Sequence, residues 1–194
     1  MKLKTETRKE EIINTAAKLF KERGYSAVTM RDLASAMGIK AASLYNHIKS
    51  KQEILKEIII SLAEEFTQGL ELIQQSSTSS VEKIEEVVKL HVSITSQNTY
   101  GMASLNNDWM HLEEKRDYYL KLRSNYEEEL RRIIAEGVKN GEIIDENIEI
   151  MLFSILSTLR SLYLWIPKKD YLNPEKLSQQ LSRVLVKGIN KKID

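Results

Sequence analysis

The chain has 194 residues, of which 42% are hydrophobic and 29% charged, with only 2 prolines and 7 glycines. This balance excludes a disordered chain and predicts a globular, largely helical protein with a sizeable core. The absence of cysteine excludes disulfides and thiolate metal sites. Residues 1–51 hold 11 Lys or Arg and 5 Asp or Glu, a net charge of +6, whereas the remaining 143 residues hold 18 and 23, a net charge of −5. A basic N-terminal segment on an acidic body is typical of a DNA-binding module attached to a domain that avoids DNA.

The first predicted helix opens at a capping box formed by Thr7 and Glu10. Its apolar face comprises Ile12, Ile13, Ala16, Ala17, Leu19 and Phe20, and Gly24 is expected to end it. The segment before this helix is polar and lacks the apolar core of a signal peptide, so we expect a cytoplasmic protein.

The segment Thr29–Lys51 predicts a helix-turn-helix. Thr29 is suited to cap the first helix, with Asp32 in its first turn, and Gly38 supplies the positive φ that ends it. In the second helix, expected from Lys40 to Ile48, Leu44 and Ile48 face inward at i, i+4. Small and hydrogen-bonding side chains occupy the other positions, as suits a helix that enters the DNA major groove.

The remaining pattern is helical throughout. A second capping box at Ser50 and Glu53 opens a long helix that runs to about Gln74 and joins the DNA-binding module to the rest of the chain. Further helices are expected at residues 81–97, 113–140, 146–166 (capped by Asp145) and 175–191 (opened by Pro174), with a broken helix between 98 and 111. We therefore expect an all-α fold of about nine helices, divided into a DNA-binding domain at residues 1–51 and a helical effector-binding and dimerisation domain at 52–194.

The most apolar stretch, Ile148–Ile166, has 13 apolar residues in 19 but also carries Glu149 and Arg160. A membrane span needs about 20 mostly apolar residues, and charges near its centre are costly. We expect a buried or dimer-forming helix here, and no membrane partner.

The N-terminal segment resembles TetR-type (TetR/AcrR) bacterial transcriptional regulators between Ile12 and Leu55. The resemblance rests on several motifs in order: AAKLF at residues 16–20, VTMRDLA at 28–34, MGI at 37–39, LY at 44–45 and KSKQEIL at 49–55. Two residues differ from the family pattern: Lys40 stands where Ser or Thr usually caps the recognition helix, and Ile48 replaces a Phe. The resemblance implies a homodimer that binds a palindromic double-stranded DNA operator, with a small-molecule effector controlling the separation of its recognition helices.

The family's DNA-contacting positions correspond here to Thr29, Arg31, Lys40, Ala42, Ser43, Tyr45, Asn46, His47 and Lys51. Thr29, Tyr45, His47 and Lys51 are suited to phosphate oxygens, whereas Lys40, Ser43 and Asn46 are suited to base edges and the Ala42 methyl group to thymine. For Tyr45 and His47 the alternatives are a packing residue and an ordinary surface histidine.

The C-terminal half resembles, over about forty residues, regulators that sense acyl-CoA or related lipid-like effectors. It shares LRSLYLW at residues 159–165 and NPE at 173–175. An apolar cavity with a few polar groups suits such an effector. Its candidate lining residues are Phe66, Leu70, His91, Tyr100, Met102, Trp109, Met110, Tyr118, Tyr126, Phe153 and Arg160, each of which is otherwise explained as plain core. Arg160 is expected to pair with an acidic effector group or, slightly favoured, with a carboxylate across a dimer interface.

The last two helices are expected to form a four-helix bundle with those of a second subunit. Its apolar residues are Leu152, Ile155, Leu156, Leu159, Leu181, Leu185 and Ile189. The resulting hypothesis is a ligand-responsive regulator, most simply a repressor that its effector releases from DNA. No catalytic motif occurs and no cofactor is expected. The alternatives to a regulator are a helical interaction module and a helical enzyme or metal protein, whose site would use His91, His111, Asp108, Glu113 and Glu114.

Overall fold

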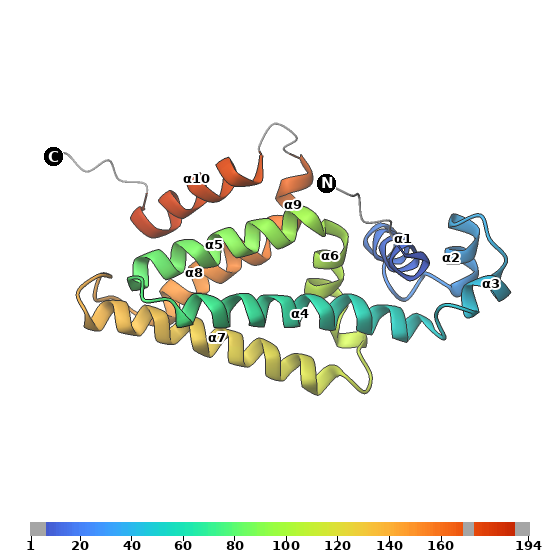
Figure 1. The fold of residues 1–194 in the computed structure, drawn as a ribbon, viewed down its shortest axis with the longest axis horizontal. Helices are drawn as coiled ribbons and strands as arrows, with labels where there is room; N and C mark the ends of the chain where they lie inside the picture. The colour runs from blue at the N-terminus through green and yellow to red at the C-terminus, as the bar shows by residue number, and fades with distance from the viewer. Residues whose placement is uncertain (1–6, 169–172, 189–194) are drawn as a thin grey trace. The chain divides into compact units, whose positions relative to one another are not determined.

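The computed structural model describes residues 7–168 and 173–188, and all of its regular structure is helical (Figure 1). The helices are α1 (Arg8–Arg23), α2 (Met30–Ala36), α3 (Ala41–Tyr45), α4 (Lys51–Gln75), α5 (Ser80–Gln97), α6 (Thr99–Asn107), α7 (Arg116–Lys139), α8 (Ile148–Arg160), α9 (Leu162–Trp165) and α10 (Pro174–Lys187). Two 3-10 turns, η1 (Trp109–His111) and η2 (Ile166–Lys168), complete them. The expected all-α fold is confirmed.

The chain forms two compact units. The head unit comprises residues 1–63 and 100–120, and the body unit comprises residues 64–99 and 121–194. Helices α4 and α7 each contribute residues to both units. Helix α6 and η1 belong to the head unit, although they lie far from its other elements in the sequence.

Local capping determines where the N-terminal helices begin. Thr7 and Thr29 each accept a hydrogen bond from the backbone N–H three residues on. The carboxylates of Glu10 and Asp32 in turn accept the backbone N–H groups of Thr7 and Thr29, which completes two capping boxes. Gly38 follows α2 with φ +65°, a conformation that costs a residue with a side chain more than glycine. These features agree with the expectations from the sequence.

The head unit is built around the inward faces of α1 to α4. Ile12 of α1, Leu33 of α2, Leu44 of α3 and Ile54 of α4 are almost entirely buried. Ile48, which replaces the family's usual phenylalanine, is also buried and fills its place between α3 and α4. Helix α2 packs on both α1 and α3, which together form the helix-turn-helix module.

The body unit is organised around α5, which packs along α10 and also against α8 and α9 (Figure 1). Leu130, Ile133 and Ile134 of α7 are buried in this unit. Helix α8 buries Leu152, Ile155, Leu156 and Leu159 within the same chain.

This burial corrects part of the expected dimer interface. The apolar surface of Leu152, Ile155, Leu156 and Leu159 is already covered within the chain, so these residues have almost none to offer a second subunit. They lie in the core because α8 is apolar around most of its circumference, and its most buried face meets the other helices of the body unit. Leu181 and Leu185 are partly exposed on α10, and Ile189 lies outside the described residues.

The C-terminal helices also differ in their bounds from the expectation. Asn147, not Asp145, caps α8, since its side-chain oxygen accepts the N–H groups of Glu149 and Ile150. The expected single helix ends at Arg160 and resumes after Ser161 as the four-residue α9. Over the described part of the chain, only Ile148–Trp165 has the length and composition of a membrane span, with mean hydropathy 1.3. One such segment is weak evidence for a membrane protein, because the core helix of a soluble protein passes the same test.

Candidate DNA-binding surface and effector site

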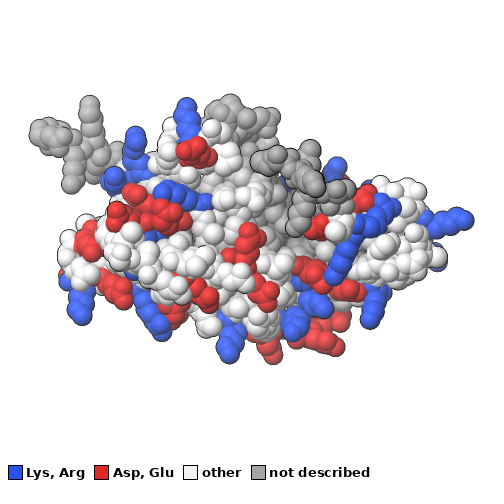
Figure 2. Space-filling model, in the orientation of Figure 1, with Lys and Arg blue, Asp and Glu red and all other residues white. Residues whose placement is uncertain are grey.

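The tip formed by α2, the turn and α3 presents the residues expected to contact DNA. Arg31, Lys40, Ala42, Ser43, Asn46 and His47 are exposed, and Tyr45 retains 52% of its accessible surface. Lys and Arg side chains project from this tip in Figure 2, with few acidic side chains among them. Because Leu44 and Ile48 anchor α3 from the other side, the polar residues form one outward face.

Helix α3 is shorter than expected and spans only Ala41–Tyr45. Its N-cap residue, Lys40, makes no side-chain capping bond, because a lysine side chain has no oxygen to accept the first N–H groups. The turn that follows is held by bonds from the N–H groups of His47 and Ile48 to the carbonyl of Leu44. The start of α3 is thus uncapped by a side chain, whereas its shorter length arises at the C-terminal end, where a turn replaces the expected helix after Tyr45.

Lys51, which is expected to contact a phosphate, bonds to backbone carbonyls within the chain. Its Nζ donates to the carbonyl oxygens of Tyr25 at 2.9 Å and Val28 at 2.8 Å, and lies 3.4 Å from that of Ser26. It also sits 4.3 Å above the centre of the Tyr25 ring, in cation–π geometry. An ammonium group has three donors, so these carbonyls satisfy it within the chain.

The Tyr25 ring joins a third element to this cluster. His111 of η1 stacks on it at 5.2 Å, and the carbonyl of His111 accepts a 2.8 Å bond from Gln52 Nε2. Burial, and then the carboxylates of Glu113 and Asp108, raise the pKa of Tyr25 to about 12, so the phenol stays neutral. The loop after α1, the start of α4 and η1 are therefore held by one set of contacts within the head unit.

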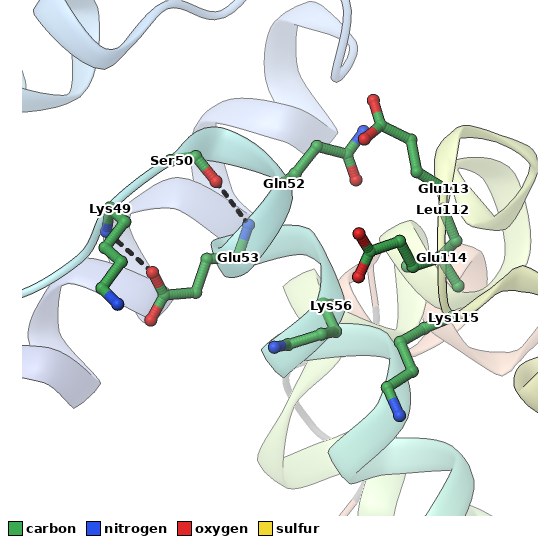
Figure 3. Close-up of a pocket in the computed structure, with 9 residues that line it drawn as sticks. All are labelled: Lys49, Ser50, Gln52, Glu53, Lys56, Leu112, Glu113, Glu114 and Lys115. Atoms are coloured by element: carbon green, nitrogen blue, oxygen red, sulfur yellow. Dashed lines mark hydrogen bonds between the residues drawn. The ribbon is translucent and has the colours of Figure 1, made fainter.

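A groove of about 420 Å³ lies beside this cluster, between the start of α4 and the loop before α7 (Figure 3). Glu53 accepts the Lys49 N–H at 2.7 Å, and its own N–H donates to Ser50 Oγ at 3.1 Å. The Glu53 carboxylate therefore accepts the N–H of Lys49, one residue before the Ser50 N–H of the expected capping box. The groove is lined by Lys49, Ser50, Gln52, Glu53, Lys56, Leu112, Glu113, Glu114 and Lys115. With three cations, three carboxylates and a single apolar residue, it does not suit an apolar effector.

The body unit contains an aromatic cluster formed by Phe66 of α4, His91 of α5 and Tyr126 of α7. The ring centres of Phe66 and His91 are 4.5 Å apart, and Tyr126 meets both rings edge-on at 6.1 and 5.8 Å. His91 Nε2 and Tyr126 Oη share a buried hydrogen bond of 2.9 Å. Leu70, one turn beyond Phe66 on α4, is also buried. Three of the expected effector residues are therefore in direct contact with one another, and Leu70 lies one turn from Phe66 on α4.

The electrostatics of this cluster keep it neutral. Burial, and then the positive charge of Arg160, lower the pKa of His91 to about 3. Burial also raises the pKa of Tyr126. Arg160 itself donates to Glu127 Oε1 at 2.6 Å, and Arg123 shares the same carboxylate at 3.3 Å. Arg160 thus pairs with Glu127 of its own chain.

Three buried polar atoms on α5 have no hydrogen-bond partner among the described residues: Ser96 Oγ, His91 Nδ1 and Thr95 Oγ1. The side chains of His91 and Thr95 are almost completely buried, and they lie one helical turn apart. A buried polar group without a partner costs about 1–3 kcal/mol. Sequence reasoning missed Thr95, although a threonine four residues after a histidine on an otherwise apolar helix face is a detectable signal.

The other expected effector residues lie elsewhere. Tyr100, Met102, Trp109, Met110 and Tyr118 belong to the head unit, where Met102 is core and Met110 is 56% exposed. Tyr100 is exposed, with Lys21 Nζ 5.1 Å from its ring centre, and Trp109 contacts Tyr119. Phe153 of the body unit is 72% exposed, so within the chain it lines no internal site. Among residues 7–168 and 173–188, no three His, Asp or Glu side chains are placed to bind a metal ion.

Replacing Lys51 by Ala is expected to lower the free energy of unfolding by about 1–2 kcal/mol, because two or three loop carbonyls lose their donor. DNA affinity falls with it, yet the slope of log affinity against log salt stays that of the parent, because no phosphate contact is removed. Urea unfolding and a salt titration of operator binding measure both quantities. A slope reduced by about one would restore Lys51 as a phosphate contact.

The buried neutral His91 makes stability depend on pH. Its pKa is near 6.5 in the unfolded chain and about 3 in the folded one, so between these values the unfolded state binds more protons. Its contribution is full above pH 6.5 and is lost as the pH falls toward 3. Between pH 7 and 5 we expect the parent to lose about 2 kcal/mol more than His91→Phe, by urea unfolding. Equal losses would show that His91 charges freely in the folded state.

Comparison with known proteins agrees with both halves of the chain. Residues 12–58 match the family of bacterial regulatory proteins, tetR family, and residues 77–189 match the tetracyclin repressor-like C-terminal domain. The HTH-type transcriptional repressor KstR2 of Rhodococcus jostii is 25% identical over 94% of this chain and 91% of its own. The crystal structure of the TetR family regulator PfmR from Thermus thermophilus is 27% identical, with a TM-score of 0.81 over 93% of this chain and 99% of its own.

A third similar structure is AibR in complex with isovaleryl coenzyme A and operator DNA. It is 22% identical, with a TM-score of 0.77 over 93% of this chain and 98% of its own, and so supports the fold. Each half of the sequence thus matches the corresponding half of one family. The chain belongs to the TetR family of bacterial transcriptional regulators.

Proposed function

We propose that this chain is a homodimeric, cytoplasmic repressor that binds a palindromic operator through residues 1–51 and releases it when a small, mainly apolar effector binds within residues 52–194. The observation that carries the proposal is the two-sided α3. Leu44 and Ile48 fix it to the head unit, while Lys40, Ser43 and Asn46 stand exposed for base edges.

Not every exposed residue of this tip has the same role. Arg31 is a cation on α2 and is suited to a phosphate oxygen, which positions the protein without reading sequence. Thr29 uses its hydroxyl to accept the Asp32 N–H as a cap and to donate to the Asp32 carboxylate, so a contact with phosphate would compete with the donated bond. Asn46 follows the last residue of α3 and carries an amide suited to adenine.

Dimerisation is assigned to the exposed side of α8, α9 and α10. Ile150, Phe153 and Leu164 follow helical spacing along α8 and α9, and Val184 is exposed on α10. Adjacent apolar residues in contact with water mark an association surface. We propose that this surface replaces the buried leucines of α8 as the contact with the second subunit, while Leu181 and Leu185 remain candidates at its edge.

The effector is assigned to the cluster of Phe66, His91 and Tyr126. Helix α4 carries both Phe66 and, at its start, Lys51, which holds the loop before the recognition module. A ligand that favours one position of α4 would therefore act on the head unit, provided that it binds the DNA-free state more tightly. An acyl thioester is the first class to test, given the coenzyme A ligand of AibR and the similarity to the Bacillus subtilis fatty acid metabolism regulator protein, 24% identical over 94% of this chain and 95% of its own.

Operator binding tests the proposed DNA contacts of the tip formed by α2, the turn and α3. With an operator selected from random inverted repeats, Asn46→Ala is expected to cost about 1–3 kcal/mol at one base position per half-site. Arg31→Ala is expected to weaken binding to all sequences alike and to reduce the salt slope by about one per subunit. Quantitative gel shifts at several salt concentrations measure both effects. The control is Lys139→Ala, which removes an exposed cation from α7; an equal effect there, or no selected operator, would refute the assignment.

Dimerisation is tested at Phe153. Phe153→Glu places a charge on the proposed interface and is expected to give monomers in sedimentation experiments, while monomer stability changes by about 0.5 kcal/mol or less. Leu72→Glu, at an exposed apolar residue of α4, is the matched control and leaves the dimer intact. A Phe153→Glu protein that remains dimeric at the parent's affinity places the interface elsewhere.

A further inference from the structure

The aromatic cluster of the body unit leaves hydrogen-bonding capacity unused. His91 and Tyr126 share one bond, and His91 Nδ1 has no partner among the described residues. One turn along the same helix, Thr95 Oγ1 is also without a partner, and the Thr95 side chain is fully buried. Buried polar atoms in folded proteins nearly always have partners, so an adjacent pair without them points to a missing group.

The unused capacity can be counted for either direction of the shared bond. If Tyr126 donates to His91 Nε2, then Nδ1 carries the proton and is a free donor, while the phenol oxygen can still accept. If His91 donates instead, the phenol proton is the free donor and Nδ1 the free acceptor. The Thr95 hydroxyl adds one more donor and acceptor. In both cases the cluster offers at least one donor and one acceptor to a third party.

The charges around the cluster select against an ionised partner. Burial keeps His91 neutral at physiological pH. The nearby cation, Arg160, is held by Glu127, which also binds Arg123. An ammonium buried beside Thr95 would be repelled by Arg160, and a carboxylate would have to compete with Glu127 for that guanidinium. Burying an unpaired charge is far more costly than burying a neutral dipole.

The surroundings of the two unpaired atoms are apolar. The Phe66 ring covers His91 at 4.5 Å, and Leu70 on the same helix is buried. On α5 itself, Val88 and Val92 are buried. A ligand that bonds to these atoms must therefore bury an apolar body against these side chains.

Resting on the proposed function, we propose that the effector carries a neutral oxygen function, such as a ketone, ester or thioester carbonyl, on an apolar body, and that His91 and Thr95 are its hydrogen-bonding partners. A free carboxylate of the same chain length is then a poor effector. The two residues recognise the class of effector and have no part in DNA binding.

The unliganded protein provides the first test. Thr95→Val keeps the shape of the side chain and removes the unpaired hydroxyl, so it should raise the Tm by about 2–4 °C. Thr158→Val is the control, because the Thr158 hydroxyl already bonds to the Ser154 carbonyl at 3.0 Å, and no rise is expected there. A lower Tm for Thr95→Val would show that the hydroxyl has a structural partner and would overturn the proposal.

Matched probes provide the second test. Methyl dodecanoate and 2-tridecanone should raise the Tm of the parent by about 2 °C or more, and sodium dodecanoate should raise it less. Both neutral shifts should be lost in Thr95→Val and in the double variant His91→Phe, Tyr126→Phe, and kept in Thr158→Val. A larger shift with dodecanoate, no shift with either neutral probe, or shifts that survive in both variants would overturn the proposal.

The two tests are separate from the proposed repression, because no DNA is present in either. A protein that binds the neutral probes as described but selects no operator would refute the repressor and leave this inference standing. A protein that binds its operator yet shows the contrary thermal shifts would do the reverse.

Discussion

The ammonium group of Lys51 holds together two parts of the head unit that the sequence keeps apart. It binds the carbonyls of Tyr25 and Val28, in the loop between α1 and α2, from the first residue of α4. The Tyr25 carbonyl also accepts the Val28 N–H at 3.3 Å within the loop, and the lysine adds a donor to both carbonyls from outside the loop. The recognition module can keep its orientation on α4 because this loop is fixed at both ends: by Lys51 on one side and by the Thr29 cap on the other.

The same loop is where η1 meets the helix-turn-helix. His111 stacks on Tyr25, and Gln52 donates to the His111 carbonyl. Lys9 of α1 also pairs with Glu57 of α4 at 3.0 Å, although both groups are substantially exposed and the pair contributes little by itself. These polar contacts add to the apolar core that α1 to α4 share in the head unit, in which Ile54 of α4 is fully buried.

The body unit buries polar groups that lower its stability. Its α5 is surrounded by apolar residues, and yet it retains a buried histidine and threonine with unpaired atoms. A core selected for stability alone would replace Thr95 with valine. The persistence of an unfavourable arrangement in an otherwise well-packed helix is the structural basis for assigning these residues to ligand recognition, since functional sites commonly reduce stability.

The sequence by itself determined the helices and the exposed residues of the tip formed by α2, the turn and α3. Caps such as Thr7 and Thr29, and the inward spacing of Leu44 and Ile48, act within three or four residues, so local pattern is enough to predict them. Even the uncapped start of α3 followed from Lys40. Tertiary structure decided the partners of Lys51, 26 and 23 residues away, and of Arg160, 33 residues away. It also decided which side of α8 is core, because a helix that is apolar almost all round has no pattern to orient it, and only the surrounding helices leave Phe153 outside and Leu159 inside.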